Sequence, residues 1–308
     1  MSRVASVTSE QPRATAVATV DAPLPIDLAR VHVVLGGRGR RRVLGSALTA
    51  RADARLTTAE RTAIDAVVRA VQLLRERAGL AGIDDAGRAV TLVLRDTEAD
   101  SGGPWATNGE LAVGSRNALM DMVGDAARPS TLLTVDVAVH ELTHVVQFAR
   151  MPAGAKPHGA LLEGIADTAA ALATGDDTLG EGFYRRDAAG RPRGAVRELG
   201  APRVAGPNLG EVDRRYEDAI RRNEEPHQAG GLVSATFFAI RATLGRERAE
   251  QLLWWVIRDT TAWKSGGSWK ELALALRRGA AALWPGDSLG SSTVEQALLG
   301  TGLARAAA

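Results

Sequence analysis

Residues 132–148 read LLTVDVAVHELTHVVQF, and this apolar run contains the pentapeptide His140-Glu141-Leu142-Thr143-His144. The run predicts a helix, on which two histidines four residues apart project from one face. Two imidazoles so placed can hold one zinc ion, and the glutamate between them can act on a water molecule at the metal. The alternative is a pair of ordinary helix histidines with a solvated glutamate. Only five histidines occur in the 308 residues, and two of them stand in this pattern, which favours the metal site.

A catalytic zinc site needs a third protein ligand and leaves one position open. Gln147 stands where the metzincin pattern has glycine, and no histidine follows until His158, so that pattern is excluded. Glu163 and Asp167 lie four residues apart in an apolar, alanine-rich stretch, and they therefore share a helix face. We expect Glu163 to be the third ligand and Asp167 to accept the second ring N–H of a ligand histidine. An ordinary polar helix face is the alternative for this pair.

The two segments together resemble the thermolysin family of zinc metallopeptidases, in its short-propeptide, protealysin-like form. HELTH at 140–144 is similar to the zinc helix of that family, and GALLEGIAD at 159–167 to its G-A-x-x-E-x-x-x-D helix. The resemblance implies an α+β fold of two lobes, β-rich first and helical second, with the zinc helix in the cleft between them. It also implies a zinc-dependent endopeptidase, in which a metal-activated water attacks the peptide bond and Glu141 is the general base.

The resemblance extends to residues that would contact substrate. His227, in PHQAGGL at 226–232, matches a family histidine that stabilises the oxyanion, and Arg197 matches an arginine that holds a substrate carbonyl. Trp105 and Asn108 lie near the edge strand that receives substrate in the family, and we expect them to contact it as well.

A calcium site is a further expectation. Asp136, four residues before His140, matches an aspartate that binds structural calcium in the family. With Asp176, Asp177 and Glu181 it could supply the oxygen ligands that calcium prefers. A surface acidic loop is the alternative for these carboxylates.

The chain also departs from the family pattern. Residues 151–158 lack the tyrosine that assists the oxyanion, and the asparagine that begins the substrate strand is missing near Trp105. His227 would then stabilise the oxyanion almost alone, which predicts slow turnover or a narrow substrate range. Two alternatives stay open. One is a thermolysin-like pseudo-enzyme that binds zinc or peptide with little catalysis, and the other is a non-catalytic protein whose structural metal site is closed by a fourth ligand such as His158.

Composition narrows the classes of partner. The chain is 45% apolar and 24% charged, its net charge is +2, and it has no cysteine. We therefore expect no nucleic-acid partner, no disulfides and no cysteine chemistry. The resemblance to the thermolysin family implies a peptide or protein substrate. No apolar run is long enough to span a membrane. We also expect the protein to be a monomer. The N-terminus has no secretory pattern, which leaves a cytoplasmic location or non-classical export open.

The order of the secondary-structure signals suggests how the chain is divided. Residues 1–28 read as a disordered or short pro-segment, 29–130 as the β-rich lobe and 131–308 as the helical lobe with the zinc site. Strands are expected at 29–35, 88–95 and 110–113. A capping box at 57–60 predicts a helix that ends before Gly79, and two helices are expected in 268–302.

Overall fold

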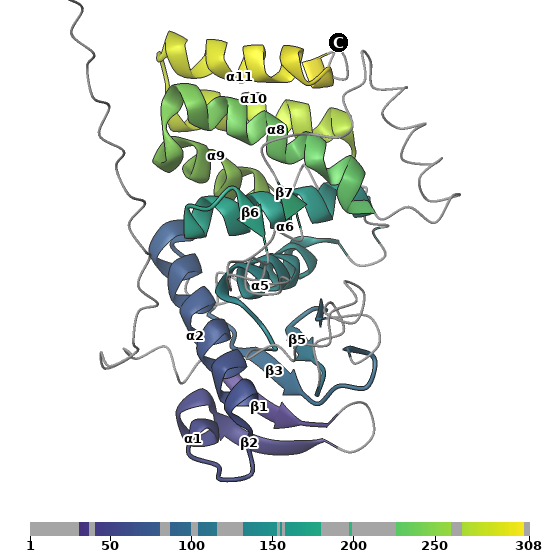
Figure 1. Cartoon of the computed structure of the whole chain (residues 1–308). Helices are drawn as coiled ribbons and strands as arrows, with labels where there is room; N and C mark the ends of the chain where they lie inside the picture. Colours follow the sequence, from purple (N-terminus) through teal and green to yellow (C-terminus); the bar gives the residue numbers. More distant parts are fainter. Residues whose placement is uncertain are drawn as a thin grey trace, which may run out of the picture.

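The computed structural model describes residues 31–36, 41–80, 87–99, 104–115, 132–152, 155, 158–179, 197–198, 226–259 and 267–304, with backbone alone at 197–198 and 226–228. In Figure 1 a sheet lies at one end of the molecule and a stack of helices at the other, with the helix α5 between them. The described strands that form this sheet all come before residue 114, and the long helices after residue 132 build the other end.

The sheet has five strands in the order β2-β1-β3-β5-β4. Their bounds are β1 Val31–Leu35, β2 Arg42–Ser46, β3 Val90–Leu94, β4 Trp105–Ala106 and β5 Glu110–Val113. The three central strands are parallel, while the two edge strands pair antiparallel to their neighbours. The central strands are rich in buried valine and leucine, as parallel strands covered by helices usually are. The expected strands at 29–35, 88–95 and 110–113 are confirmed.

Helix α2 (Thr58–Ala78) is the last element of the connection from β1 to its parallel neighbour β3, after β2 and a short helix. It begins at Thr57, whose hydroxyl accepts from the Glu60 N–H while the Glu60 carboxylate accepts from the Thr57 N–H, so the expected capping box is confirmed. It ends at Gly79, whose φ of 63° is in the left-handed region that glycine adopts without strain. A short helix, α1 (Ala47–Arg51), precedes it. The buried face of α2 packs on the sheet and on α5.

Two helices carry the sequence motifs. Helix α5 (Val135–Arg150) stops before Pro152, and helix α6 (Gly159–Thr174) stops at Gly175, where φ is 84°. Helix α5 contacts β4 and β5 on the sheet side and α6 on the other side. The HELTH segment therefore lies between the sheet and the helical stack, in the middle of the molecule (Figure 1).

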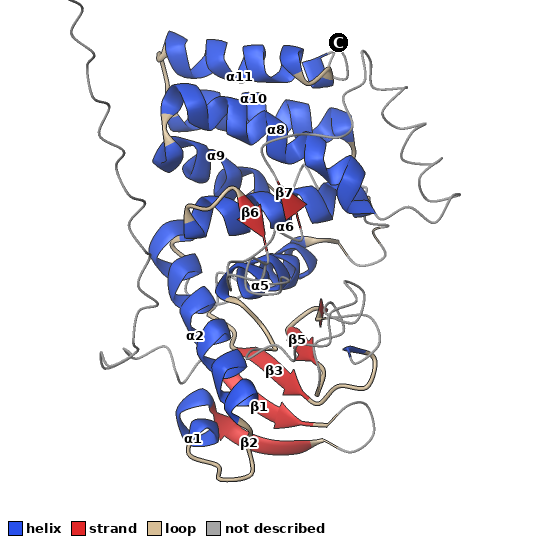
Figure 2. Cartoon of the chain, viewed as in Figure 1, coloured by secondary structure: helices blue, strands red, loops and turns tan. Residues whose placement is uncertain are grey.

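The remaining helices form layers beyond α6, as Figure 2 shows in blue. They are α8 Pro226–Leu244, α9 Arg246–Arg258, α10 Trp269–Leu283 and α11 Ser288–Gly300. The last two confirm the pair of helices expected in 268–302. Two short strands, β6 (Thr178–Leu179) and β7 (Arg197–Glu198), form a separate antiparallel sheet that the sequence did not predict.

Helices α6 and α8 cross with their backbones close together. A Cβ atom added to Gly230 would lie 2.8 Å from the Gly164 nitrogen and 2.9 Å from the Ala160 carbonyl oxygen. Beside this crossing, the hydroxyls of Thr168 and Ser234 are 3.2 Å apart. Gly164 follows Glu163 directly, so the close approach of α8 occurs next to Glu163 in the sequence.

The order of the elements confirms the α+β class. The N-terminal segment 1–28 and the boundary at residues 130 and 131 lie outside the described residues. Among the described helices, none combines the length and the apolar character that crossing a bilayer requires.

Candidate metal centre

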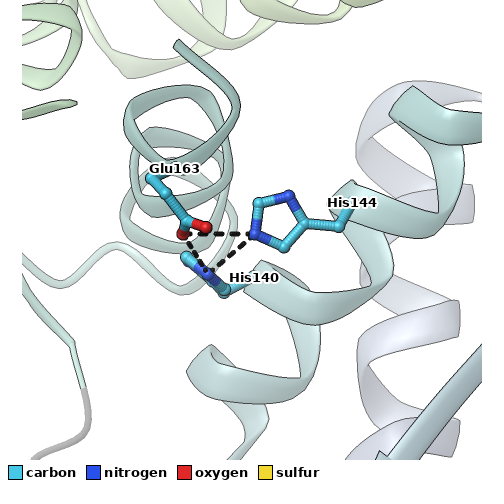
Figure 3. Close-up of side chains that lie close together, drawn as sticks. All are labelled: His140, His144 and Glu163. Atoms are coloured by element: carbon cyan, nitrogen blue, oxygen red, sulfur yellow. Dashed lines mark hydrogen bonds and ion pairs between the residues drawn. The ribbon is translucent and has the colours of Figure 1, made fainter. Parts of the chain in front are cut away.

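Three side chains from two neighbouring helices converge (Figure 3). His140 Nε2 lies 3.1 Å from His144 Nε2 and 3.2 Å from Glu163 Oε2, and His144 Nε2 lies 3.3 Å from the same oxygen. Both histidines are buried on α5, and the Glu163 side chain on α6 is 21% exposed. In the part of the chain that the structure describes, this is the one group of three or more side chains so placed that they could hold a metal ion.

The size of this triangle fits a tetrahedral metal. Zinc bonds to imidazole nitrogen and carboxylate oxygen are about 2.0–2.1 Å long, so the ligand atoms of a tetrahedral zinc lie about 3.3 Å apart. The three observed separations, 3.1–3.3 Å, match this spacing. A divalent cation above the triangle would therefore contact all three atoms without a rearrangement of either helix.

On the side away from the cluster, each imidazole has a polar oxygen close to its Nδ1 atom. His140 Nδ1 lies 2.8 Å from Asp167 Oδ1, and His144 Nδ1 lies 3.0 Å from Gln147 Oε1. An acceptor at Nδ1 favours the neutral tautomer with its proton there, which leaves the Nε2 lone pair directed at the cluster. In that tautomer, two lone pairs and a carboxylate oxygen would face one another. Such electron-rich atoms repel at this distance, and a cation between them removes the repulsion.

The expected general base lies in the same helix. Glu141 follows His140 on α5 and is 8% exposed. A buried carboxylate is costly without compensating contacts, and a metal ion nearby would provide compensating charge. His227 lies in the first turn of α8 and Arg197 in β7, but only their backbones are described.

The two expected substrate contacts lie at the edge of the sheet. Trp105 is in the edge strand β4, and its indole Nε1 donates to Asp96 Oδ1 at 3.1 Å. Asn108 lies in the turn between β4 and β5, where Gly109 has a φ of 101°, and its side-chain oxygen accepts from Arg88 at 2.9 Å. Helix α5 contacts both β4 and β5, so this hairpin is a direct neighbour of the helix that carries His140 and His144.

The carboxylates expected to bind calcium have protein partners. Asp177 accepts two hydrogen bonds from Arg241, at 2.5 and 2.8 Å, and this hydrogen-bonded ion pair lowers the pKa of Asp177. Asp176 accepts from the backbone N–H and hydroxyl of Thr178, and Asp136 from the Val137 N–H. Glu181 lies outside the described residues, and the calcium site remains a prediction.

His158, the suggested fourth ligand, is the N-cap residue of α6. Its ring packs edge-on against Trp269, with centroids 5.3 Å apart, and burial lowers its pKa. The group of potential metal ligands comprises His140, His144 and Glu163 and does not include His158. Within the described residues, the site is therefore a three-ligand arrangement.

Gln147 is a site residue that sequence reasoning considered only as a mismatch to the metzincin pattern. It is fully buried, and it contacts His144 on its own helix. The available signal was its position, three residues after His144 in an apolar run, because such spacing places both side chains on one face.

No family model and no curated protein matches the sequence. In three dimensions the chain is similar to the precursor of protealysin, a metalloproteinase from Serratia proteamaculans. The TM-score is 0.63, the matched region covers 89% of this chain and 88% of that chain, and sequence identity is 15%. At this identity the likeness establishes the fold alone. The thermolysin-like α+β fold inferred from the two sequence motifs is therefore confirmed.

Proposed function

We propose that this protein is a zinc-dependent endopeptidase with His140, His144 and Glu163 as its metal ligands. The observation that carries the proposal is the convergence of these three atoms at 3.1–3.3 Å, with acceptors behind both imidazoles. Two nitrogens and one carboxylate oxygen are a donor set typical of catalytic zinc in peptidases, where a fourth position stays open. The shared fold with a metalloproteinase precursor supports the same reaction class.

In this reaction the peptide carbonyl carbon is attacked by water. Zinc, when bound, acts as a Lewis acid that polarises the carbonyl and lowers the pKa of water toward about 7. Glu141 accepts a proton from the attacking water and then transfers it to the leaving amine. Glu141 is buried in α5 next to the proposed ligand His140. In such a low-dielectric environment, neighbouring charges strongly affect proton transfer.

Residues from other elements complete the proposed site. His227, at the start of α8, would donate a hydrogen bond to the oxyanion, an interaction worth about 3 kcal/mol in comparable sites. Arg197 would hold a substrate carbonyl. A peptide substrate would lie along β4 beside Trp105, because β4 is the outermost of the described strands on that side of the sheet and an added strand is a common mode of peptide binding.

The test is peptide cleavage by the wild type and by Glu141→Gln, with the zinc content of both determined by mass spectrometry. The proposal predicts one zinc in each protein, cleavage by the wild type that a chelator abolishes, and no cleavage by the variant. Equal cleavage by the two proteins would exclude Glu141 as general base and refute the mechanism.

The same experiment addresses both alternatives. A wild type that binds zinc and leaves peptides intact is the thermolysin-like pseudo-enzyme. A closed structural site would exclude water from the metal, which the absorption spectrum of the cobalt-substituted protein reports. The packing of His158 against Trp269 argues against this histidine as the closing ligand.

A further inference from the structure

Gln147 lies behind the second metal-ligand histidine and is 0% exposed. Its side-chain oxygen lies 3.0 Å from His144 Nδ1, and its side-chain nitrogen donates to the Leu162 carbonyl oxygen at 3.3 Å. Leu162 precedes Glu163 on α6. The amide of Gln147 therefore joins a ligand on one helix to the backbone next to a ligand on the other.

The two contacts determine how the amide is oriented. A backbone carbonyl only accepts hydrogen bonds, so the NH2 group of Gln147 must face Leu162 and its oxygen must face His144. That oxygen in turn can only accept, so His144 must carry its proton on Nδ1. The Nε2 lone pair then faces Glu163 and His140, as a metal ligand requires.

We propose that Gln147 is the positioning residue of the metal centre, and that it holds His144 in the tautomer and ring orientation that bind zinc. Asp167 lies beside Nδ1 of His140, as Gln147 does beside Nδ1 of His144. One histidine therefore contacts a carboxylate and the other a neutral amide. This inference rests on the proposed zinc site, and it concerns metal affinity and not the cleavage step.

The experiment compares zinc dissociation constants of the full-length wild type and two variants, measured by competition with a chelating dye. Gln147→Leu removes the acceptor for His144 at similar volume, and we expect zinc binding about 10–100-fold weaker, the usual effect of losing such a partner. Gln147→Glu keeps an acceptor for His144 and loses the donor to Leu162, so it should bind zinc within about threefold of the wild type. Gln72→Leu, at another buried glutamine in α2, is the matched control and should bind as the wild type does.

The pattern across the variants separates positioning from structural support. If Gln147 only connected α5 to α6, the Glu variant would lose as much zinc affinity as the Leu variant, and that result would overturn the proposal. Unchanged affinity in Gln147→Leu would overturn it as well. If circular dichroism shows that Gln147→Leu does not fold, Gln147→Glu alone tests the proposal. Retained zinc affinity in that variant supports it, and a loss of more than about tenfold refutes it.

Failure of the proposed function has a different signature. A wild type that binds zinc but cleaves no peptide contradicts the peptidase assignment and leaves the role of Gln147 intact. Nitrogen-15 shifts of the His144 ring in the metal-free wild type give an independent readout, because they distinguish the two neutral tautomers. The proton is expected on Nδ1, and a proton on Nε2 would contradict the proposal.

Discussion

At the residue scale, the chemistry of the site depends on which nitrogen of each imidazole carries the proton. The acceptors behind both rings direct the Nε2 lone pairs toward Glu163. Of the two acceptors, Asp167 is the charged one, and its side chain is 2% exposed. A buried carboxylate next to a metal-bound imidazole raises the basicity of that ligand and holds its ring in place.

The first prediction concerns Asp167→Asn, which keeps the size of the side chain and removes its charge. Zinc affinity should fall about 10–100-fold, because His140 loses a charged partner at Nδ1. Competition titration measures this effect. Asp259→Asn is the matched control, since the Asp259 side chain is also only 8% exposed but pairs with Arg278 at 2.6 Å. Equal losses in both variants would show a general cost of removing a buried charge and no role for Asp167 at the metal.

The sequence predicted the convergence of His140, His144 and Glu163 because each lies in a motif with regular helical spacing. It did not predict the role of Gln147, since that depends on the Leu162 carbonyl of the neighbouring helix. The ion pair of Asp177 with Arg241 was missed for the same reason, because 64 residues separate the partners. Contacts within one helix can be read from spacing, and contacts between helices need their relative placement.

At the scale of elements, the position of α8 depends on its crossing with α6. Gly164 and Gly230 allow the two backbones to approach more closely than any side chain permits. His227 lies in the first turn of α8, just before Gly230, so we expect this crossing to determine where that turn lies relative to Glu163. The crossing is therefore part of the support of the site as well as of the fold.

The second prediction concerns Gly230→Ala. Its new methyl group would meet the Gly164 nitrogen at 2.8 Å, so the helices must separate, and unfolding free energy should fall by about 1–3 kcal/mol. Chemical denaturation measures the change. Gly300→Ala is the control, because nothing lies within 4 Å of its added Cβ, and alanine there should leave stability unchanged or raise it by up to about 1 kcal/mol. Equal effects at the two positions would contradict the close crossing.

Long elements with local signals were predictable from the sequence. Helix α2 has a capping box at Thr57 and a left-handed glycine at its end, and β3 is a run of buried valine and leucine. Helix α1, of five residues, and β4, of two, were not predicted. Such short elements carry too few residues to show a period, and β4 exists through its pairing with β5.

At the scale of the whole molecule, α9 connects the helical stack to the part of the chain that covers the sheet. Arg258, at its end, donates to the carbonyl oxygen of Ala78 at the end of α2. Arg246, at its start, donates to the Leu172 and Ala173 carbonyl oxygens at the end of α6. Glu250 lies between them, 3% exposed, and its carboxylate is 3.8 Å from Arg77 of α2.

The third prediction concerns the pH dependence of stability at Glu250. Burial raises the pKa of this carboxyl above its ordinary value, although Arg77 and Arg246 oppose the shift. A raised folded-state pKa contributes stability that is fully present below the unfolded pKa and is lost as pH rises through the folded pKa. Glu250→Gln cannot ionise, so its melting temperature relative to the wild type should increase between pH 4.5 and pH 8. Both proteins are measured with chelator present. A difference in melting temperature that stays constant over this pH range would contradict the prediction.

The number of zinc ions bound per folded chain tests most directly whether α5 and α6 together form a metal centre. Native mass spectrometry of the wild type and of Glu163→Ala, both saturated with zinc and then dialysed, provides this number. We predict one zinc per wild-type chain and less than about one-tenth as much in the variant, because two imidazoles alone leave the ion with too few ligands. A wild type without zinc, or a variant that retains it fully, would contradict the convergence of His140, His144 and Glu163 on one ion.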